Sequence, residues 1–312
     1  MIALLSRRLA EAIPLLLAIS ALAFTLVRLV PGGPVEVYLS NPGVRPEDLE
    51  RLRRALGLDQ PLWQQYVSWL GAFVSGDWGF SFSDGRPVLI RIVERLPASA
   101  ELVAASVGLG LVAAVPAGVL GALARGTWID RFATSIAVVG VSLPAFWFGL
   151  LLQLVFAVGL GWLPSSGRGA ESGLLSRLSH LILPASVLAF VHAAAWSRYL
   201  RASLVDTLGR PFLQSARARG VSRVRLIALH ALPNAVAPAA TVMLLDVALL
   251  VPGAVVTESV FAWPGVGSLF TEALARRDYT VLMAMLMVSS AAVLVIGVVA
   301  DLVHAWLDPR VS

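Results

Sequence analysis

Long apolar runs separated by short polar segments occupy most of this chain. Six of them are long enough to cross a bilayer: Leu9–Leu29, Ala98–Ala124, Phe132–Leu160, Leu181–Ser197, Pro233–Thr257 and Tyr279–Leu307. A helix of about 20 apolar residues spans the hydrocarbon core and satisfies its backbone hydrogen bonds internally. The pattern therefore predicts an all-α polytopic membrane protein with six transmembrane helices. Pro144 lies inside the third run, where we expect it to kink the helix.

One long polar stretch, 31–97, separates the first two runs. Within it, acidic residues precede arginines over 46–57, which suits the helix dipole and predicts a short amphipathic helix. The aromatic residues that follow have two open interpretations, a small packed core or a position at the bilayer surface: Trp63, Tyr66, Trp69 and Trp78. We expect three parts: 1–30 with the N-terminus and first helix, 31–97 as a small extracytoplasmic subdomain, and 98–312 as a core domain with five transmembrane helices.

A short basic loop joins the fourth and fifth runs, within 205–232. Leu208, Phe212 and Ala216 recur every four positions, which predicts an apolar stripe on a helix. Gly220 is expected to end that helix, and Ser222 to cap a second short one. Four arginines of the loop cannot lie in hydrocarbon: Arg217, Arg219, Arg223 and Arg225. The loop is predicted to be a docking surface; the alternative is an ordinary basic inner loop.

Composition excludes several kinds of chemistry. The chain is 58% hydrophobic with a mean hydropathy of +0.81, and its 24 basic residues are all arginine. Without lysine it has neither the phosphate-binding lysine of a P-loop nor a Schiff-base amine. It contains no cysteine, and its four histidines lack the spacing of metal ligands. We therefore expect no metal and no cofactor bound by this chain.

The distribution of arginine predicts the orientation. With six helices both termini lie on one side, and arginines outnumber acidic residues in the segments on that side. The positive-inside rule then places both termini and the 205–232 loop in the cytoplasm. Because the arginines flank apolar runs, they indicate membrane topology and do not indicate nucleic-acid binding.

The loop resembles the cytoplasmic loop of binding-protein-dependent ABC importer permeases. That family's pattern is Glu-Ala-Ala, three residues, Gly, nine residues, an apolar residue, one more, and Leu-Pro. This chain places at those positions Gln214, Ser215, Ala216, Gly220, Leu232 and Pro233. It departs from the pattern at Gln214, at Ser215 and at His230, which takes the apolar place.

Further motifs are similar to the first permease subunit (B-type) of the dipeptide and oligopeptide branch. They run along nearly the whole chain: Leu56–Pro61, Gly76–Ser81, Arg95–Leu102, Ser142–Trp147, Leu160–Pro164, Glu258–Gly267, Arg277–Tyr279 and Leu307–Arg310. Each motif alone is weak, whereas their order and spacing together are specific. The long first outer loop also favours this subunit over its shorter-looped partner.

The resemblance implies a multi-pass protein of the bacterial inner membrane that forms half of a translocation pathway. It implies as partners a homologous second permease subunit, two ABC ATPase subunits that bind ATP and Mg, and an extracytoplasmic solute-binding protein. This chain is then not an enzyme. The residues implied to couple it to an ATPase are Gln214, Ser215, Ala216, Arg217, Arg219 and Gly220.

Three residues are candidates for the substrate pathway: Asp246, Glu258 and Trp263. Asp246 lies in mid-span, where an ionisable group is costly unless it faces a cavity or a partner. It suits a peptide's amino group, or it pairs with an arginine or hydroxyl at the interface between the two permeases. Trp263 either dips toward the pathway or lies in a surface turn. Glu101 is expected to cap the second span or to bind a backbone amide.

Other functions remain as alternatives. An ion-coupled secondary transporter would need no ATPase, and its internal repeat is not evident here. An intramembrane hydrolase would need a nucleophile motif that we do not find. Within the importer interpretation, glutathione, a nickel chelate or an oligosaccharide are alternative cargoes.

Overall fold

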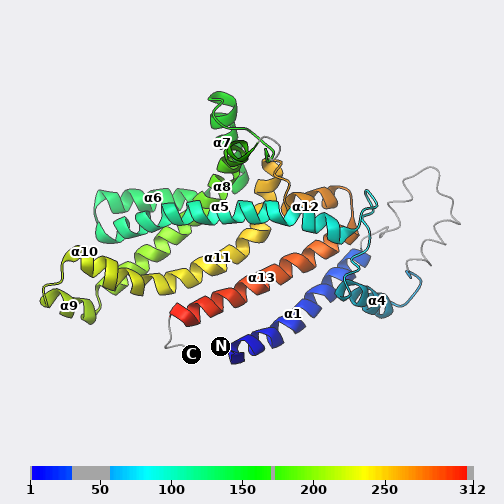
Figure 1. The fold of residues 1–312 in the computed structure, drawn as a ribbon, viewed down its shortest axis with the longest axis horizontal. Helices are drawn as coiled ribbons and strands as arrows, with labels where there is room; N and C mark the ends of the chain where they lie inside the picture. The colour runs from blue at the N-terminus through cyan, green and yellow to red at the C-terminus, as the bar shows by residue number, and fades with distance from the viewer. Residues whose placement is uncertain (1, 30–56, 170–172, 308–312) are drawn as a thin grey trace.

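A computed structural model describes residues 2–29, 57–169 and 173–307 (Figure 1). In these ranges the chain is helical apart from loops, and the one extended pairing is a bridge between Phe80 and Pro87. The predicted all-α class is confirmed. The amphipathic helix expected over 46–57 lies outside the described residues, except for Gly57.

Five long helices make up the body of the molecule: α1 (Ile2–Leu29), α5 (Val88–Leu123), α8 (Leu174–Leu208), α11 (Leu232–Val260) and α13 (Tyr279–Leu307). The described residues contain five helical stretches long and apolar enough to cross a membrane. Several exceed the predicted limits; α5 begins at Val88 and continues through Pro97 and Pro116. The expected boundary between 97 and 98 therefore falls inside a helix.

The third predicted span is a broken helix. α6 (Trp128–Ser142) ends before Pro144, and α7 (Ala145–Leu152) continues as a π-helical turn, Gln153–Gly159, at 105° to α6. Proline cannot donate a backbone hydrogen bond and disfavours helical geometry in the residue before it, and Leu143 is extended. The prediction that Pro144 only kinks the third span is therefore wrong. If α6 and α7 are counted as one broken span, the described residues contain six candidate membrane spans.

α8 packs closely on α5 and α6. Small residues of α5 differ in burial: Ala113 is exposed, Ala117 is half-buried and Gly121 is buried. The buried stripe of α5 recurs every four residues: Leu102, Ser106, Gly110, Ala114, Gly118 and Ala122. A side-chain carbon on Gly118 would lie 2.9 Å from the Ser197 carbonyl oxygen of α8.

A buried ion pair joins the α5–α6 turn to α8. Arg201 donates from Nε and Nη2 to the two oxygens of Asp130, at 2.6 and 2.7 Å. The Gly126 amide donates to the same carboxylate at 2.9 Å, and Asp130 is 5% exposed. A bidentate pair of this kind fixes the relative orientation of its two elements.

The opposite end of the bundle carries α4 (Leu62–Val74) and α12 (Val266–Ala275), at the right of Figure 1. Neighbouring rings from α1, α4 and the following loop contact one another: Phe24, Tyr66, Trp69, Phe73 and Trp78. The packed-core interpretation thus holds for three of the four predicted aromatics, whereas Trp63 is exposed.

A polar network holds the loop between α4 and α5 against α13. Arg91 is 7% exposed and lies within 4 Å of carboxylate oxygens of Asp84, Glu272 and Asp278. Burial alone would raise the pKa of Asp84, but hydrogen bonds from Arg86 and Ser81 and the charge of Arg91 lower it below its ordinary value. The network therefore favours a charged Asp84.

Replacing Gly118 with leucine tests the contact between α5 and α8. The new side chain meets α8 backbone, and overpacking of this kind costs about 1–3 kcal/mol. We expect Gly118→Leu to lower the melting temperature of the purified protein by several degrees. Gly108→Leu in the same helix is the matched control, because open space surrounds that position. Equal melting temperatures would contradict the packing described here.

Candidate functional site

The basic loop forms a helix, a turn and a second short helix. α9 (Pro211–Ala218) begins with Pro211 at its first turn, and α10 (Arg223–Leu226) follows. Gly220 has a φ of +80°, and its amide donates to the Arg217 carbonyl at 2.9 Å. This left-handed residue ends the helix as predicted. Ser222 occupies the predicted N-cap position of α10, but its side chain makes no capping hydrogen bond. The predicted position is therefore correct and the predicted hydrogen bond is wrong.

One face of the loop is buried against three long helices. Leu213 and Leu226 are no more than 1% exposed. They belong to a single apolar cluster with Ala122 of α5, Leu204 of α8 and Ala235 of α11. The cluster also contains Ala216 of α9 and Ala231 of the turn before α11. The predicted stripe is partly wrong, since Phe212 is 42% exposed. α8 ends at Leu208 and α9 starts afresh at Pro211, so no continuous helix carries a four-residue repeat across the break.

The other face of the loop projects away from the bundle. Five of the six predicted coupling residues are exposed there: Gln214, Ser215, Arg217, Arg219 and Gly220. Ala216 is 4% exposed and packs in the apolar cluster beneath the loop, with Leu213 and Leu226. Within the described ranges, no ion pair is formed by Arg217, Arg219, Arg223 or Arg225. The structure thus places the predicted residues together, with positive charge available to a partner.

The loop continues into α11 without a flexible link. A π-helical turn, Ile227–Ala231, precedes Pro233, which has no amide hydrogen to donate to the preceding turn. The Asn234 side chain donates to the His230 carbonyl at 2.7 Å, and Ser203 of α8 donates to the Ala235 carbonyl at 2.8 Å. A force on the loop therefore reaches α8 and α11 through packed and hydrogen-bonded contacts.

Asp246 of α11 contacts two aromatic side chains of α8. Trp196 Nε1 donates to its Oδ2 at 3.0 Å, and His192 Nδ1 lies 3.6 Å from the same oxygen. The Asp246 side chain is 27% exposed. Within the described residues it has no arginine partner. Sequence reasoning missed the partners, although His192 and Trp196 lie four residues apart and hence on one helix face.

Glu258 lies in the last turn of α11 and is fully buried against the start of α12. Its carboxylate accepts hydrogen bonds from Ser99 Oγ at 2.6 Å and from the Ser268 amide at 3.0 Å. A side-chain carbon on Gly265 would lie 2.3 Å from this carboxylate, and one on Gly267 would lie 2.6 Å from Val255 Cα. The two glycines of the motif leave room for the carboxylate and for the α11 backbone, so Glu258 fastens α12 to α11 and α5.

Trp263 is also fully buried. Its Nε1 donates to the Ala98 carbonyl at 2.8 Å, and Arg168 lies 5.9 Å from the ring centroid. The interpretation as a surface turn with an interfacial tryptophan is therefore wrong. In this conformation neither Glu258 nor Trp263 reaches a surface, and the assignment of all three candidates to a pathway stays a prediction.

Glu101 forms a cluster that sequence reasoning did not identify. It accepts from Arg168 Nη2 at 2.7 Å and from Arg177 Nε at 2.6 Å. The predicted capping role is wrong, because α5 starts at Val88 and Glu101 lies well inside it. The cluster joins α5 to the loop before α8 and to α8 itself.

Comparison with known proteins places this geometry in a family. The family described as "Binding-protein-dependent transport system inner membrane component" matches residues 96–312, and "Binding-prot-dependent transport system membrane comp, N-term" matches residues 1–103. The chain is 38% identical over 316 residues to the oligopeptide transport system permease protein AppB of Bacillus subtilis strain 168, with 100% of both chains covered. It is 33% identical to the dipeptide transport system permease protein DppB of Escherichia coli K12, covering 100% of this chain and 99% of that one.

A further relative is the glutathione transport system permease protein GsiC of Escherichia coli O1:K1 / APEC, at 37% identity over 98% of this chain and 97% of that one. Solved structures support the fold. The inward-facing MetNI methionine ABC transporter aligns with a TM-score of 0.59 and 19% identity over 72% of this chain and 99% of the other. An amino acid ABC transporter with histidines aligns with a TM-score of 0.55 and 14% identity over 69% and 94%. The family resemblance read from the motifs is thereby confirmed, and the chain belongs to the inner membrane components of binding-protein-dependent transport systems.

Proposed function

We propose that this chain is the permease subunit of an ATP-driven ABC importer for peptides, and that it forms half of the translocation pathway. One observation carries the proposal. The α9–α10 loop has a face of buried apolar side chains fixed to three long helices and an opposite face of exposed arginines and small polar residues. A loop built in this way suits a partner that pushes or pulls on the bundle.

The partners in this proposal are a homologous second permease, two ATPase subunits that hold ATP and Mg, and an extracytoplasmic solute-binding protein. The chain lies in the bacterial inner membrane with both termini and the α9–α10 loop in the cytoplasm. Gln214, Ser215, Arg217, Arg219 and Gly220 contact the ATPase, while Ala216 holds α9 in place. The ion-coupled alternative assigns no task to this exposed basic surface.

Coupling follows from the way the loop is held. ATP binds the closed ATPase pair more tightly than the open pair, so it shifts the population of ATPase conformations. The loop moves with its ATPase, and the cluster around Leu213 and Leu226 carries that displacement to the ends of α5, α8 and α11. The spanning helices then exchange between inward-open and outward-open arrangements.

Peptide cargo is favoured by the names of the relatives, and glutathione, itself a peptide, is the cargo named for one of them. Asp246 provides a carboxylate in mid-span that is partly exposed and has no arginine partner within the described residues. We assign it to the recognition of the substrate's amino group. Nickel chelates and oligosaccharides remain alternative cargoes, distinguished by the experiment below.

Reconstitution tests the function. The complex that copurifies with the full-length chain is placed in liposomes with its binding protein, and uptake of labelled dipeptide, glutathione, nickel chelate and oligosaccharide is measured. We expect dipeptide uptake that requires ATP and is unaffected when ion gradients are collapsed. Uptake by the chain alone, driven by an ion gradient, would contradict the proposal.

A bulky residue at Gly220 tests the docking geometry. Gly220→Val strains a left-handed turn in which β-branched residues are rarely found, and it changes the angle between α9 and α10. We expect substrate-stimulated ATP hydrolysis to fall severalfold while the complex still assembles. Gly76→Val is the control, since Gly76 has a φ of +91° and open surroundings at the far end of the bundle. An equal loss of substrate-stimulated ATP hydrolysis in both variants would contradict a specific docking role for the loop.

Charge reversal tests the contact itself. The double change Arg217→Glu and Arg219→Glu places negative charge on the exposed face without touching the buried cluster. Exposed charge pairs at an interface affect association and are screened by salt. We expect the ATPase to dissociate at lower salt than from the unchanged chain. Retention of the ATPase to the same salt concentration would argue that these arginines do not face it.

Replacing Asp246 by asparagine tests the amino-group assignment. Removing one charged partner of a buried ammonium costs about 1.5–3 kcal/mol, or roughly tenfold to a hundredfold in binding. We expect Asp246→Asn to reduce uptake of a dipeptide with a free amino group by at least about tenfold while leaving that of its N-acetylated form unchanged. Asp59→Asn, at an exposed position, is the control. An equal reduction for both substrates would show a structural role.

A further inference from the structure

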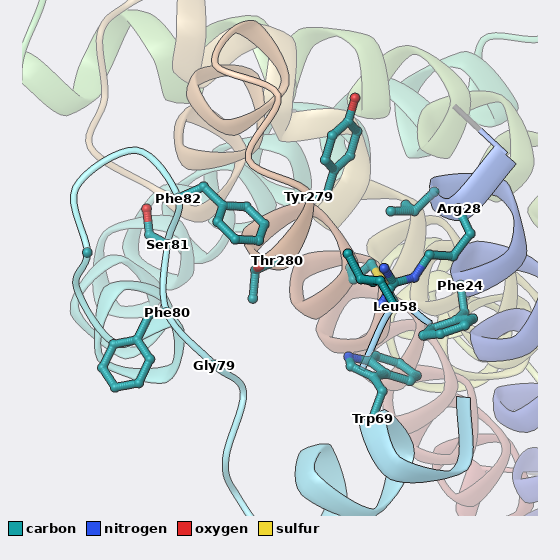
Figure 2. Close-up of a pocket in the computed structure, with 13 residues that line it drawn as sticks. Phe24, Arg28, Leu58, Trp69, Gly79, Phe80, Ser81, Phe82, Tyr279 and Thr280 are labelled. Carbon is teal, nitrogen blue, oxygen red and sulfur yellow. The ribbon is translucent and has the colours of Figure 1, made fainter. Parts of the chain in front are cut away.

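A cavity of about 440 Å³ lies at the end of the bundle opposite the α9–α10 loop (Figure 2). Its lining comes from the last turns of α1, from α4, from the turn before α5 and from the start of α13. The residues that matter here are Phe24, Arg28, Trp69, Phe80, Tyr279 and Thr280. The lining is thus mainly aromatic and apolar, with one cation. Neither the coupling loop nor Asp246 contributes to it.

Arg28 brings an unsatisfied positive group to this cavity. Its guanidinium carbon lies 5.0 Å from the centroid of the Phe24 ring. Its Nη1 is buried and has no hydrogen-bond partner within the part of the chain that the structure describes. Figure 2 shows the side chain reaching from α1 toward Leu58, above Trp69. Leaving a buried donor of a charged group unpaired is costly, so the site suits an anionic acceptor.

The cavity lies at the level where spanning helices end. Arg28 is the last residue but one of α1, and Tyr279 is the first residue of α13. Helix ends mark the boundary between hydrocarbon and headgroups, and tryptophan and tyrosine are enriched there. The position of Trp69 and Tyr279 in the lining matches that boundary.

α4 adds an apolar face at the same end. Trp63, Val67 and Val74 are 68%, 59% and 78% exposed, and they follow one another at helical spacing. The helix contains no charged residue. A helix that packs one side on the protein and exposes aromatic and aliphatic groups on the other is suited to lie in the bilayer interface.

We infer that this cavity binds the phosphodiester headgroup of a membrane phospholipid, with Arg28 on the phosphate and α4 resting in the same leaflet. Phosphate oxygens supply the acceptors that the guanidinium lacks, and arginine matches them with paired N–H groups. The cavity volume falls within the range of small-ligand sites. A peptide carboxylate would offer the same charge, but the exposed apolar face of α4 and the location at the helix ends favour lipid.

Native mass spectrometry of the full-length chain with the partners that copurify tests the inference, with dioleoyl phosphatidylglycerol added from detergent. We expect Arg28→Gln to weaken lipid binding by about tenfold or more. Thr280→Trp fills the cavity without changing its charge and should have the same effect. Arg86→Gln is the matched control, because Arg86 is half-exposed at the same end and paired with Glu94. Melting temperatures show whether each variant is folded.

Equal lipid affinity in the unchanged chain and in both cavity variants would overturn the inference. So would displacement of the lipid by a dipeptide at equal concentration, which would assign the site to a peptide carboxylate. The result is independent of the proposed transport function, since lipid binding needs neither ATP nor cargo. If the chain binds lipid as expected but fails to import peptide, the lipid site is supported and the proposed transport function is contradicted.

Discussion

Three glycines let α8 lie directly against its neighbours: Gly110 and Gly118 of α5 and Gly140 of α6. At each of them an added side-chain carbon would come within about 3.0 Å of an α8 atom. Without a hydrophobic driving force between helices in lipid, close packing of this kind is a main source of association. We therefore expect α5, α6 and α8 to move as one unit. The loop that leaves α8 inherits that rigidity, because Leu213 packs on Leu204 and Ala122.

Charges within the long helices are mostly neutralised by protein groups. Asp130 pairs with Arg201 near the α5–α6 turn, Glu101 of α5 pairs with two arginines, and Glu258 is held by Ser99 and by the α12 backbone. Each of these contacts joins separate elements and stabilises the frame. Asp246 and Arg28 differ. Within the described residues Asp246 contacts His192 and Trp196 but no arginine, and Nη1 of Arg28 has no hydrogen-bond partner. In a frame that otherwise pairs its charges, these two point to ligands from outside the chain.

Sequence periodicity was sufficient for the class of fold and for most helices, because apolar length is a strong constraint in a bilayer. It placed the turn at Gly220 correctly, since a left-handed residue favours glycine. It failed where a proline acts differently in different contexts: Pro97 and Pro116 lie within α5, whereas Pro144 ends α6. Spacing alone could not choose between Ala113 and Ala114 as the buried position, because both registers offer small residues and only the neighbouring helix decides. The partners of Asp246 and Glu258 depend on contacts between distant segments, which no local pattern contains.

The most direct measurement is the distance between α9 and the end of α5 during the ATPase cycle. The chain has no cysteine to remove first, so spin labels can be attached specifically at Ala218→Cys, an exposed position of α9 outside the predicted coupling residues, and at Arg125→Cys, just after α5. If the loop and the α5–α8 unit move as one body, the distance between the labels stays the same with and without ATP while transport proceeds. A distance that changes on ATP binding would show that the loop moves independently of the helices, and rigid coupling through Leu213 and Leu226 would be contradicted.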